Sequence, residues 1–226
     1  MGLTHGSTGK NAVDNGLHIH KRSPEDVVVA VAGNPNVGKS TIFNALTGMH
    51  QHTGNWPGKT VSNAQGYFRT KKHSYVMVDI PGAYSLLAHS QEEEVARDFL
   101  CFQRPALCIV ICDAGCLQRS MNLTLQILEI VPNVIVCVNL LDEAELRGVR
   151  VDLELLEKRL GVPVVGTVAR KKQSLKRLTA LMDAAADHPR SVCSPLPCPN
   201  ALKTAAAWLE KALPPTNALP LCREWL

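Results

Sequence analysis

A glycine-rich stretch holds the residues with the most evident chemistry. Residues 33–40, GNPNVGKS, fit the pattern G-x-x-x-x-G-K-[ST] and lie between an apolar, β-branched run at 27–32 and a predicted helix at 39–47. Such a loop folds around phosphate, so that backbone N–H groups and the positive end of the following helix face the anion. Lys39 would place its ammonium at the β- and γ-phosphates, and Ser40 would offer a hydroxyl to Mg²⁺, so the stretch predicts binding of a nucleoside triphosphate. The expected phosphate-binding set is Gly33, Asn34, Asn36, Val37, Gly38, Lys39, Ser40 and Thr41.

A second motif is NLLD at residues 139–142. Its Asn139 is the last residue of the apolar run at 134–139, and the other three residues follow that run. The carboxylate of Asp142 can accept hydrogen bonds from the ring N–H and the exocyclic amine of guanine, and adenine offers no such pair of donors. Asn139 is expected to tie this loop to the phosphate-binding loop. Taken alone, the pattern is equally consistent with Asp142 capping a helix. Its place after a strand and downstream of the phosphate loop favours guanine, so the expected nucleotides are GTP and GDP.

Residues 79–82, DIPG, end another predicted strand. In a D-x-x-G sequence at this place, Asp79 can hold Mg²⁺ through water while the N–H of Gly82 meets the γ-phosphate. The segment 50–61 runs between the phosphate loop and this strand and is predicted to be a loop long enough to move. Thr60 is the residue of this loop best placed to reach Mg²⁺. The alternative is that the loop is an ordinary surface connection.

The elements that would position these loops follow from hydrophobic periodicity. Apolar runs typical of buried parallel strands alternate with segments whose apolar residues recur at the spacing of a helix face that covers a sheet. The predicted strands are 27–32, 66–70, 74–79, 107–113, 134–139 and 162–165, and the predicted helices are 39–47, 92–102, 120–130, 153–160 and 175–185. Together they predict a doubly wound α/β domain, with a mostly parallel six-stranded sheet and helices on both faces.

Composition divides the chain into three parts. Residues 1–24 carry Gly, Ser, Asn and His without an apolar core, which predicts a flexible leader and no secretion signal. The α/β pattern occupies 25–186, and seven of the 14 prolines then fall between 189 and 220. Within 187–226, one amphipathic helix is predicted at 201–213. Because one helix cannot form a core, this part is expected to pack on the main domain or to be a truncated helical domain.

The overall composition excludes several classes of protein. Of the 226 residues, 46% are hydrophobic and 19% charged, with a net charge of +4, which excludes a disordered chain and is too mild to indicate nucleic-acid binding. The longest apolar stretches, such as 106–112, are far shorter than the roughly 20 residues of a membrane helix. The eight cysteines form no C-x-x-C pair. Those inside apolar runs, Cys108, Cys112 and Cys137, are expected to be reduced, buried thiols rather than metal ligands.

Four stretches together resemble the cytosolic G domain of FeoB, the bacterial ferrous iron transporter. They are 33–40, GNPNVGKS; 54–61, GNWPGKTV; 79–86, DIPGAYSL; and 139–142, NLLD. The resemblance extends over about 26–226 and implies a P-loop NTPase fold of the Ras-like G-domain type. It also implies that Thr167, Val168 and Ala169 stand where the family has its last guanine-binding loop. The end of the chain, 199–226, is similar to the start of the helical domain that follows the G domain in this family.

The activity that the resemblance implies is slow hydrolysis of GTP. The switch segments would surround Thr60 and Gly82, and Thr60 would join Mg²⁺ in the GTP state. Ras-like proteins orient the attacking water with a Gln just after the D-x-x-G, but this chain has Ala83 there, so backbone groups or another residue would do so. The catalytic contributions are expected from Lys39, Asn36, Thr60 and Gly82.

Potassium is a further implied cofactor. Asn36 stands where related potassium-activated GTPases hold K⁺ against the phosphates, and K⁺ there supplies positive charge. The chain departs from the family pattern at Thr53, Lys59 and Ser62. The ammonium of Lys59, beside Thr60, could itself occupy the potassium site or repel K⁺ from it.

The implied partner is the membrane permease of the same transporter, which this chain does not contain, with small accessory Feo proteins as further candidates. The whole transporter would place this part at the cytoplasmic face of the bacterial inner membrane, and the chain alone is expected to be soluble. The oligomeric state stays open.

Two other function classes share part of these motifs. An RNA-associated GTPase of ribosome assembly would want a basic RNA-binding module, and Lys171, Lys172, Lys176 and Arg177 form only a small patch. A P-loop kinase would need an acceptor pocket and does not explain N-x-x-D. His50 and His52 offer only two ligands, so no iron site is assigned to them.

Overall fold

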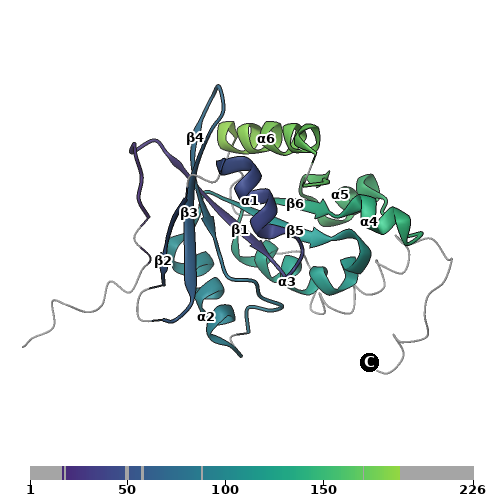
Figure 1. The fold of residues 1–226 in the computed structure, drawn as a ribbon, viewed down its shortest axis with the longest axis horizontal. Coiled ribbons are helices and arrows are strands. Elements are labelled where there is room, and N and C mark those ends of the chain that lie inside the picture. Colours follow the sequence, from purple (N-terminus) through teal and green to yellow (C-terminus); the bar gives the residue numbers. More distant parts are fainter. Residues whose placement is uncertain are drawn as a thin grey trace, which may run out of the picture.

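The structure, a computed structural model, is built on one seven-stranded sheet with helices on both faces (Figure 1). Residues 17, 19–48, 51–56, 59–87, 89–169 and 171–188 are described. The strands are β1 (Val27–Gly33), β2 (Gln51–Asn55), β3 (Ser62–Arg69), β4 (Ser74–Asp79), β5 (Leu107–Asp113), β6 (Val134–Asn139) and β7 (Val164–Gly166). The helices are α1 (Lys39–Thr47), α2 (Gln91–Asp98), the π-helical η1 (Phe99–Gln103), the 3₁₀ turn η2 (Ala114–Cys116), α3 (Leu117–Ile130), α4 (Leu141–Leu146), α5 (Leu153–Leu160) and α6 (Lys172–Asp187).

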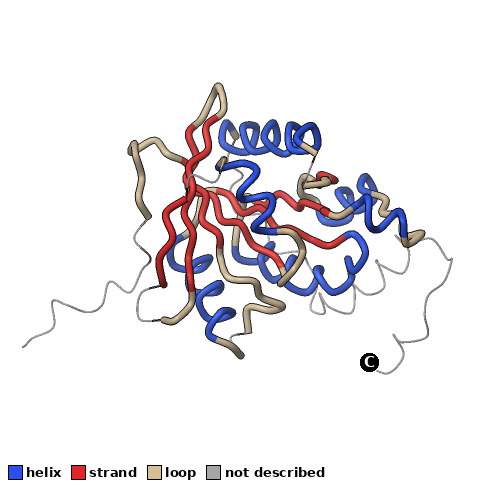
Figure 2. The backbone as a smooth tube through the Cα atoms, in the orientation of Figure 1, coloured by secondary structure: helices blue, strands red, loops and turns tan. Residues whose placement is uncertain are grey.

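The strands lie in the order β2-β3-β4-β1-β5-β6-β7, which Figure 2 shows as a fan of red segments. β3 is antiparallel to both neighbours, and every other adjacent pair is parallel. Parallel strands have their carboxyl ends on one edge of the sheet, so β1, β4 and β6 all end there, at Gly33, Asp79 and Asn139. Ligands of open α/β sheets bind outside this edge. Three of the predicted motifs therefore start from the edge where a ligand is expected.

The sheet is buried on both faces. Successive residues of a strand point to opposite sides, so on β1 Ala30 packs in a cluster with α2 and α3, whereas Val29 and Val31 pack in a cluster with α1 and α6. Figure 1 shows α1 and α6 on one side of the sheet and α2 and α3 on the other. The prediction of a doubly wound α/β fold is confirmed.

The strand cysteines are part of this core. Cys108, Cys112 and Cys137 are fully buried and carry free thiols. Burial raises the pKa of Cys112 and Cys137 to about 12, so both thiols stay protonated at neutral pH. Cys116 lies beyond the end of β5 and is exposed. The expectation of buried, reduced thiols in the strands is confirmed.

The sheet has one strand more than the six predicted. β2 lies in the segment 50–61, for which the sequence predicts a loop, and it pairs antiparallel with β3 along its whole length. β3 begins at Ser62 rather than at residue 66. The sequence of β2, QHTGN, has few of the β-branched and aromatic residues that indicate a strand. The exposed edge of β3 decides the pairing, because its N–H and C=O groups need partners.

Helix bounds differ from the prediction mainly at the ends. The helices predicted at 39–47 and 153–160 have those bounds, and α3 and α6 are longer than predicted at one or both ends. The helix predicted at 92–102 is α2 followed by the π-helical η1, and α4 is a helix that periodicity does not predict. The helix predicted at 201–213 lies outside the described residues. None of the helices in the described part of the chain has the length and apolar character needed to cross a membrane.

The described part of the predicted leader packs against the sheet. Leu17 is buried in the core, and the backbone N–H of His20 donates to the side chain of Gln65 at 3.0 Å. The carbonyl of His20 accepts from the hydroxyl of Tyr67 at 2.7 Å, and the guanidinium of Arg22 lies 3.6 Å from the Tyr67 ring. These contacts hold the described leader residues along β3.

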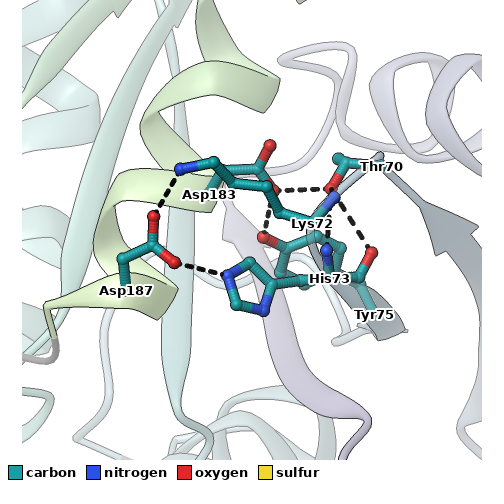
Figure 3. Close-up of polar contacts among 6 residues, drawn as sticks. All are labelled: Thr70, Lys72, His73, Tyr75, Asp183 and Asp187. Atoms are coloured by element: carbon teal, nitrogen blue, oxygen red, sulfur yellow. Dashed lines mark hydrogen bonds and ion pairs between the residues drawn. The ribbon is translucent and has the colours of Figure 1, made fainter.

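A polar cluster fastens α6 to the β3–β4 turn (Figure 3). Asp183 accepts hydrogen bonds from the hydroxyls of Thr70 and Tyr75, each at 2.7 Å. One turn later on α6, Asp187 pairs with two side chains of the hairpin turn. We call this set the hairpin cluster, and its members are Thr70, Lys72, His73, Tyr75, Asp183 and Asp187.

Candidate functional site

Lys39, Ser40 and Asp79 form the centre of the candidate site. Lys39 is the first residue of α1 and Asp79 the last of β4, so a helix start meets a strand end at the carboxyl edge of the sheet. The ammonium of Lys39 pairs with Oδ1 of Asp79, and the hydroxyl of Ser40 donates to Oδ2 at 3.4 Å. Burial raises the pKa of Asp79 and outweighs the opposing effect of Lys39. A carboxylate that has lost this much hydration gains from added positive charge, so the centre favours a cation.

The loop between β1 and α1 has the backbone that the phosphate-binding motif requires. At Gly33, a Cβ would lie 2.5 Å from the carbonyl oxygen of Ile111 on β5. Gly38 has a left-handed φ of 84°, and a Cβ there would lie 2.3 Å from Nδ2 of Asn139. Asn36 is also left-handed, with a φ of 66°, and its side chain is exposed. Left-handed residues between ordinary ones turn successive N–H groups to one side and form a concavity for an anion.

Asn139 joins this loop to the last loop of the sheet. It is fully buried, and Nδ2 donates to the carbonyl of Val37 at 3.0 Å. Its Oδ1 accepts from the hydroxyl of Thr167 and from the backbone N–H of Ala169, both at 3.1 Å. The predicted tie between Asn139 and the phosphate loop is confirmed. The same amide also brings the 167–169 segment to the site.

Asp142 lies in the first turn of α4 with an exposed side chain. Leu140 precedes this helix in a left-handed conformation, and no side chain caps the helix. The carboxylate of Asp142 accepts from the N–H of Glu143 at 3.1 Å. The capping alternative is therefore wrong for this residue, which lies inside the helix rather than at its cap. The carboxylate is exposed next to the Asn139 network.

The segment after Asp79 lies against the phosphate loop. The N–H of Ala83 donates to the carbonyl of Gly33 at 3.3 Å, and Gly82 lies against Pro35. The predicted Gly82 motif and the phosphate loop are thus neighbours. Thr41, on α1, is exposed.

Helix α3 contacts both the phosphate loop and the segment after Asp79. The sequence does not indicate these contacts. Asn34 is buried, and its Nδ2 donates to the backbone carbonyl of Arg119 at 3.2 Å. The guanidinium of Arg119 lies 4.3 Å from the ring of Tyr84, and Asn122 donates to the carbonyl of Tyr84 at 3.1 Å. The spacing of polar residues on α3 carries no motif, so these partners become visible only when the helix is packed in place.

The hydroxyl of Thr60 contacts helix α2 and not the Lys39–Ser40–Asp79 centre. This hydroxyl is exposed and donates to the side chain of Gln91 on α2 at 3.2 Å. The neighbouring ammonium of Lys59 pairs with Glu94, also on α2, at 2.5 Å. Sequence reasoning misses both Gln91 and Glu94, because nothing in the local sequence links α2 to this segment. His50 lies outside the described residues, as does the side chain of His52.

The sequence of this chain matches a known family of proteins. A model of the family described as Ferrous iron transport protein B, FeoB, matches residues 27–182. The chain belongs to the FeoB family. The FeoB resemblance predicted from the four motifs is thereby confirmed.

Relatives within the FeoB family support the assignment. The Fe(2+) transporter FeoB of Salmonella typhimurium strain LT2 is 40% identical over 161 residues, which are 70% of this chain and 21% of that protein. The G domain of T. maritima FeoB has a TM-score of 0.67 and 39% identity, covering 72% of this chain and 99% of that one. The cytosolic domain of T. maritima FeoB has a TM-score of 0.71 both in its GMPPNP form and in its GDP form II. In the GMPPNP form the identity is 39%, over 74% of this chain and 67% of that one.

The chain corresponds to a small part of a whole FeoB protein. It spans 21% of the length of the curated relative from Salmonella. The fold is that of a FeoB G domain, a P-loop NTPase.

Proposed function

We propose that this chain binds GTP with Mg²⁺ and hydrolyses it slowly, as the regulatory G domain of a ferrous iron transporter. The observation that carries the proposal is the meeting of Lys39, Ser40 and Asp79 at the carboxyl edge of the sheet, beside a loop that Asn139 locks to Thr167. A relative at 39% identity has been solved with GMPPNP, and another form of it with GDP, which supports a guanine nucleotide here. In the proposed complex, Lys39 exchanges its carboxylate partner for phosphate oxygens.

The residues present fit Mg²⁺. This ion prefers hard oxygen ligands and keeps several of its waters. The hydroxyl of Ser40 and a carboxylate oxygen of Asp79 lie 3.4 Å apart, and burial makes that carboxylate receptive to a cation. When bound, Mg²⁺ would supply positive charge that offsets the charge of the phosphates. Ser40 would ligate the ion directly, Asp79 would hold it through water, and Thr60 would join in the GTP state.

Base selection is assigned to Asp142, with the 167–169 backbone at the base edge. Calorimetry with Mg²⁺ should find GTP bound at least tenfold more tightly than ATP. The variant Asp142→Asn should lose about 10- to 100-fold in GTP affinity, since roughly 1.5–3 kcal/mol of charge-assisted hydrogen bonding is removed, and should bind XTP better than the parent does. Glu143→Gln makes the same charge change one residue later and should bind GTP as the parent does. ATP affinity equal to GTP affinity would contradict the proposal.

Potassium is proposed to sit by Asn36. The exposed amide of Asn36 in a phosphate-binding loop offers an oxygen to a monovalent cation. The ammonium of Lys59, the alternative cation, is paired with Glu94 in this structure. GTP hydrolysis should be about tenfold faster in K⁺ than in Na⁺, equivalent to roughly 1.4 kcal/mol of barrier, and Asn36→Ala should remove most of that difference. Equal rates for both proteins in both salts would rule out a potassium role and leave guanine binding intact.

The wider role is proposed from the family. The partner would be the membrane permease of the transporter, with small accessory Feo proteins as further candidates, at the cytoplasmic face of the bacterial inner membrane. Residues 25–186 would form the G domain, preceded by the leader at 1–24, and 187–226 would belong to a helical domain between the G domain and the permease. Order in the segments around Thr60 and Gly82 would report the nucleotide state to that partner.

A further inference from the structure

Helix α2 and the turn after it contact the Thr60 segment at three points. Trp56 is buried, and its ring meets Phe99 edge-on at a centroid distance of 5.4 Å. The ammonium of Lys59 pairs with Glu94 at 2.5 Å. The hydroxyl of Thr60 donates to Gln91 at 3.2 Å, and we call these three contacts the α2 seat.

The α2 seat matches helix geometry. Gln91 and Glu94 are three residues apart on α2 and so lie on one face of it. They receive two adjacent residues, Lys59 and Thr60. Lys59 also holds the pKa of Glu94 below its ordinary value, as expected for a formed ion pair. Two side chains on one helix face thus engage two consecutive residues of the opposite segment.

The seated segment is closed on itself, so it should leave as a unit. The N–H of Trp56 donates to the carbonyl of Val61 at 2.8 Å, and the N–H of Lys59 donates to the carbonyl of Trp56 at 3.0 Å. The indole N–H of Trp56 is buried without a hydrogen-bond partner among the described residues. A buried donor of this kind costs free energy, so it opposes docking of the segment.

The same helix turn receives the segment that follows Gly82. Glu93 accepts from the backbone N–H groups of Ser85 and His89, at 3.2 and 3.1 Å. The first turn of α2 therefore contacts both segments that flank the candidate metal site.

We propose that the α2 seat holds Thr60 away from the metal site, and that Gln91 and Glu94 are positioning residues that set how readily Thr60 is released to it. The inference rests on the proposed function. A ligand shifts such a balance only through its different affinity for the two states. A nucleotide with a γ-phosphate favours the released state because Thr60 gains the metal and phosphate there, whereas GDP lacks this contact. Breaking the seat should therefore strengthen GMPPNP binding and leave GDP binding unchanged.

The experiment uses the full chain with Trp208→Phe and Trp225→Phe, which leaves Trp56 as the sole tryptophan. The fluorescence emission of Trp56, measured without nucleotide, reports whether the α2 seat is formed. Calorimetry gives the GMPPNP and GDP affinities. Glu94→Gln should shift the Trp56 emission to the red before nucleotide is added and should tighten GMPPNP about twofold to fivefold, the range expected for an exposed ion pair. Gln91→Ala combined with Glu94→Gln should tighten it further, to about tenfold, with GDP unchanged.

Three variants separate release of the segment from other effects. Lys59→Met breaks the ion pair without freeing an ammonium and should act as Glu94→Gln does. The exchange Lys59→Glu with Glu94→Lys restores an ion pair and should return the parent ratio of GMPPNP to GDP affinity. Glu92→Gln changes the same charge on the same helix turn and should change neither readout.

The outcomes distinguish this inference from the proposed function. Unchanged Trp56 emission together with an unchanged ratio of affinities overturns the α2 seat. If Glu94→Gln tightens GMPPNP binding but Lys59→Met does not, the α2 seat is also overturned. The freed ammonium of Lys59 would then be acting on the phosphate. Failure of either nucleotide to bind the parent chain overturns the proposed function, and the nucleotide-free emission of the variants still tests whether the seat exists.

Discussion

The two ends of strand β4 carry similar chemical groups in different arrangements. At the carboxyl end, Asp79 meets the ammonium of Lys39 and the hydroxyl of Ser40. At the amino end and the turn before it, the hairpin cluster places Asp183 against two hydroxyls and Asp187 against an ammonium and an imidazole (Figure 3). One end lies at the edge where ligands bind, and the other joins α6 to the sheet.

The difference lies in how well each carboxylate is satisfied. Burial raises the pKa of Asp79 despite its ion pair, so that carboxylate favours further positive charge. The pKa of Asp187 is lowered to about 2, by its hydrogen bond from Lys72 first and by His73 second. A carboxylate whose negative charge is balanced by hydrogen bonds and cations stabilises a contact between elements. A buried carboxylate whose charge is only partly balanced provides a place for a cation. We therefore expect the carboxyl end of β4 to exchange its partners on ligand binding, and the amino end to keep α6 attached to the sheet.

The largest effect is expected at the carboxyl end of β4. Lys39→Met keeps the length of the side chain and removes its charge, so GTP affinity should fall at least 100-fold, or about 3 kcal/mol. The comparison requires that the variant stay folded, which thermal unfolding followed by circular dichroism would check. Nucleotide affinity equal to that of the parent would mean that the two ends of β4 do not differ in this way.

An intermediate effect is expected at the amino end of β4, in the hairpin cluster. Asp183→Ala leaves the hydroxyls of Thr70 and Tyr75 without their acceptor, which should lower the free energy of unfolding by about 1–3 kcal/mol in urea titrations. The GTP affinity of the folded variant should stay within twofold of the parent. Asp183→Asn keeps an acceptor oxygen and should cost less. A large loss of GTP affinity in Asp183→Ala would show that the two ends are coupled rather than separate.

The smallest effect is expected at Asp187 and depends on pH. Its folded-state pKa, about 2, lies below the ordinary value of 3.8, so its contribution to stability is present above pH 4 and is lost as the pH falls toward 2. The difference in urea midpoint between the parent and Asp187→Asn should therefore shrink as the pH is lowered from 6 to 3. Asp98→Asn, at an aspartate that pairs with adjacent Arg97, is the control. A difference that stays constant over this range would contradict the assignment.

Much of the fold could be predicted because strands and helices have local signatures. The β-branched run of β1 and the helical periodicity of α5 are visible within single segments. β2 could not be predicted, because its sequence has little strand preference and its pairing depends on the edge of β3. The end of α2 in a π-helical turn is likewise set by packing around Phe99 and Leu100, both buried.

The candidate site divides in the same way. Sequence alone predicted the loop at 33–40 and the carboxylates Asp79 and Asp142 as site candidates, and it identified the FeoB family, because these depend on residue types at fixed short spacings after strands. Only the tertiary structure decided that the hydroxyl of Thr60 contacts Gln91 on α2 and that α6 is tied to the hairpin turn. Those contacts join polar side chains far apart in the chain, and such residues carry no periodic pattern from which their partners could be predicted.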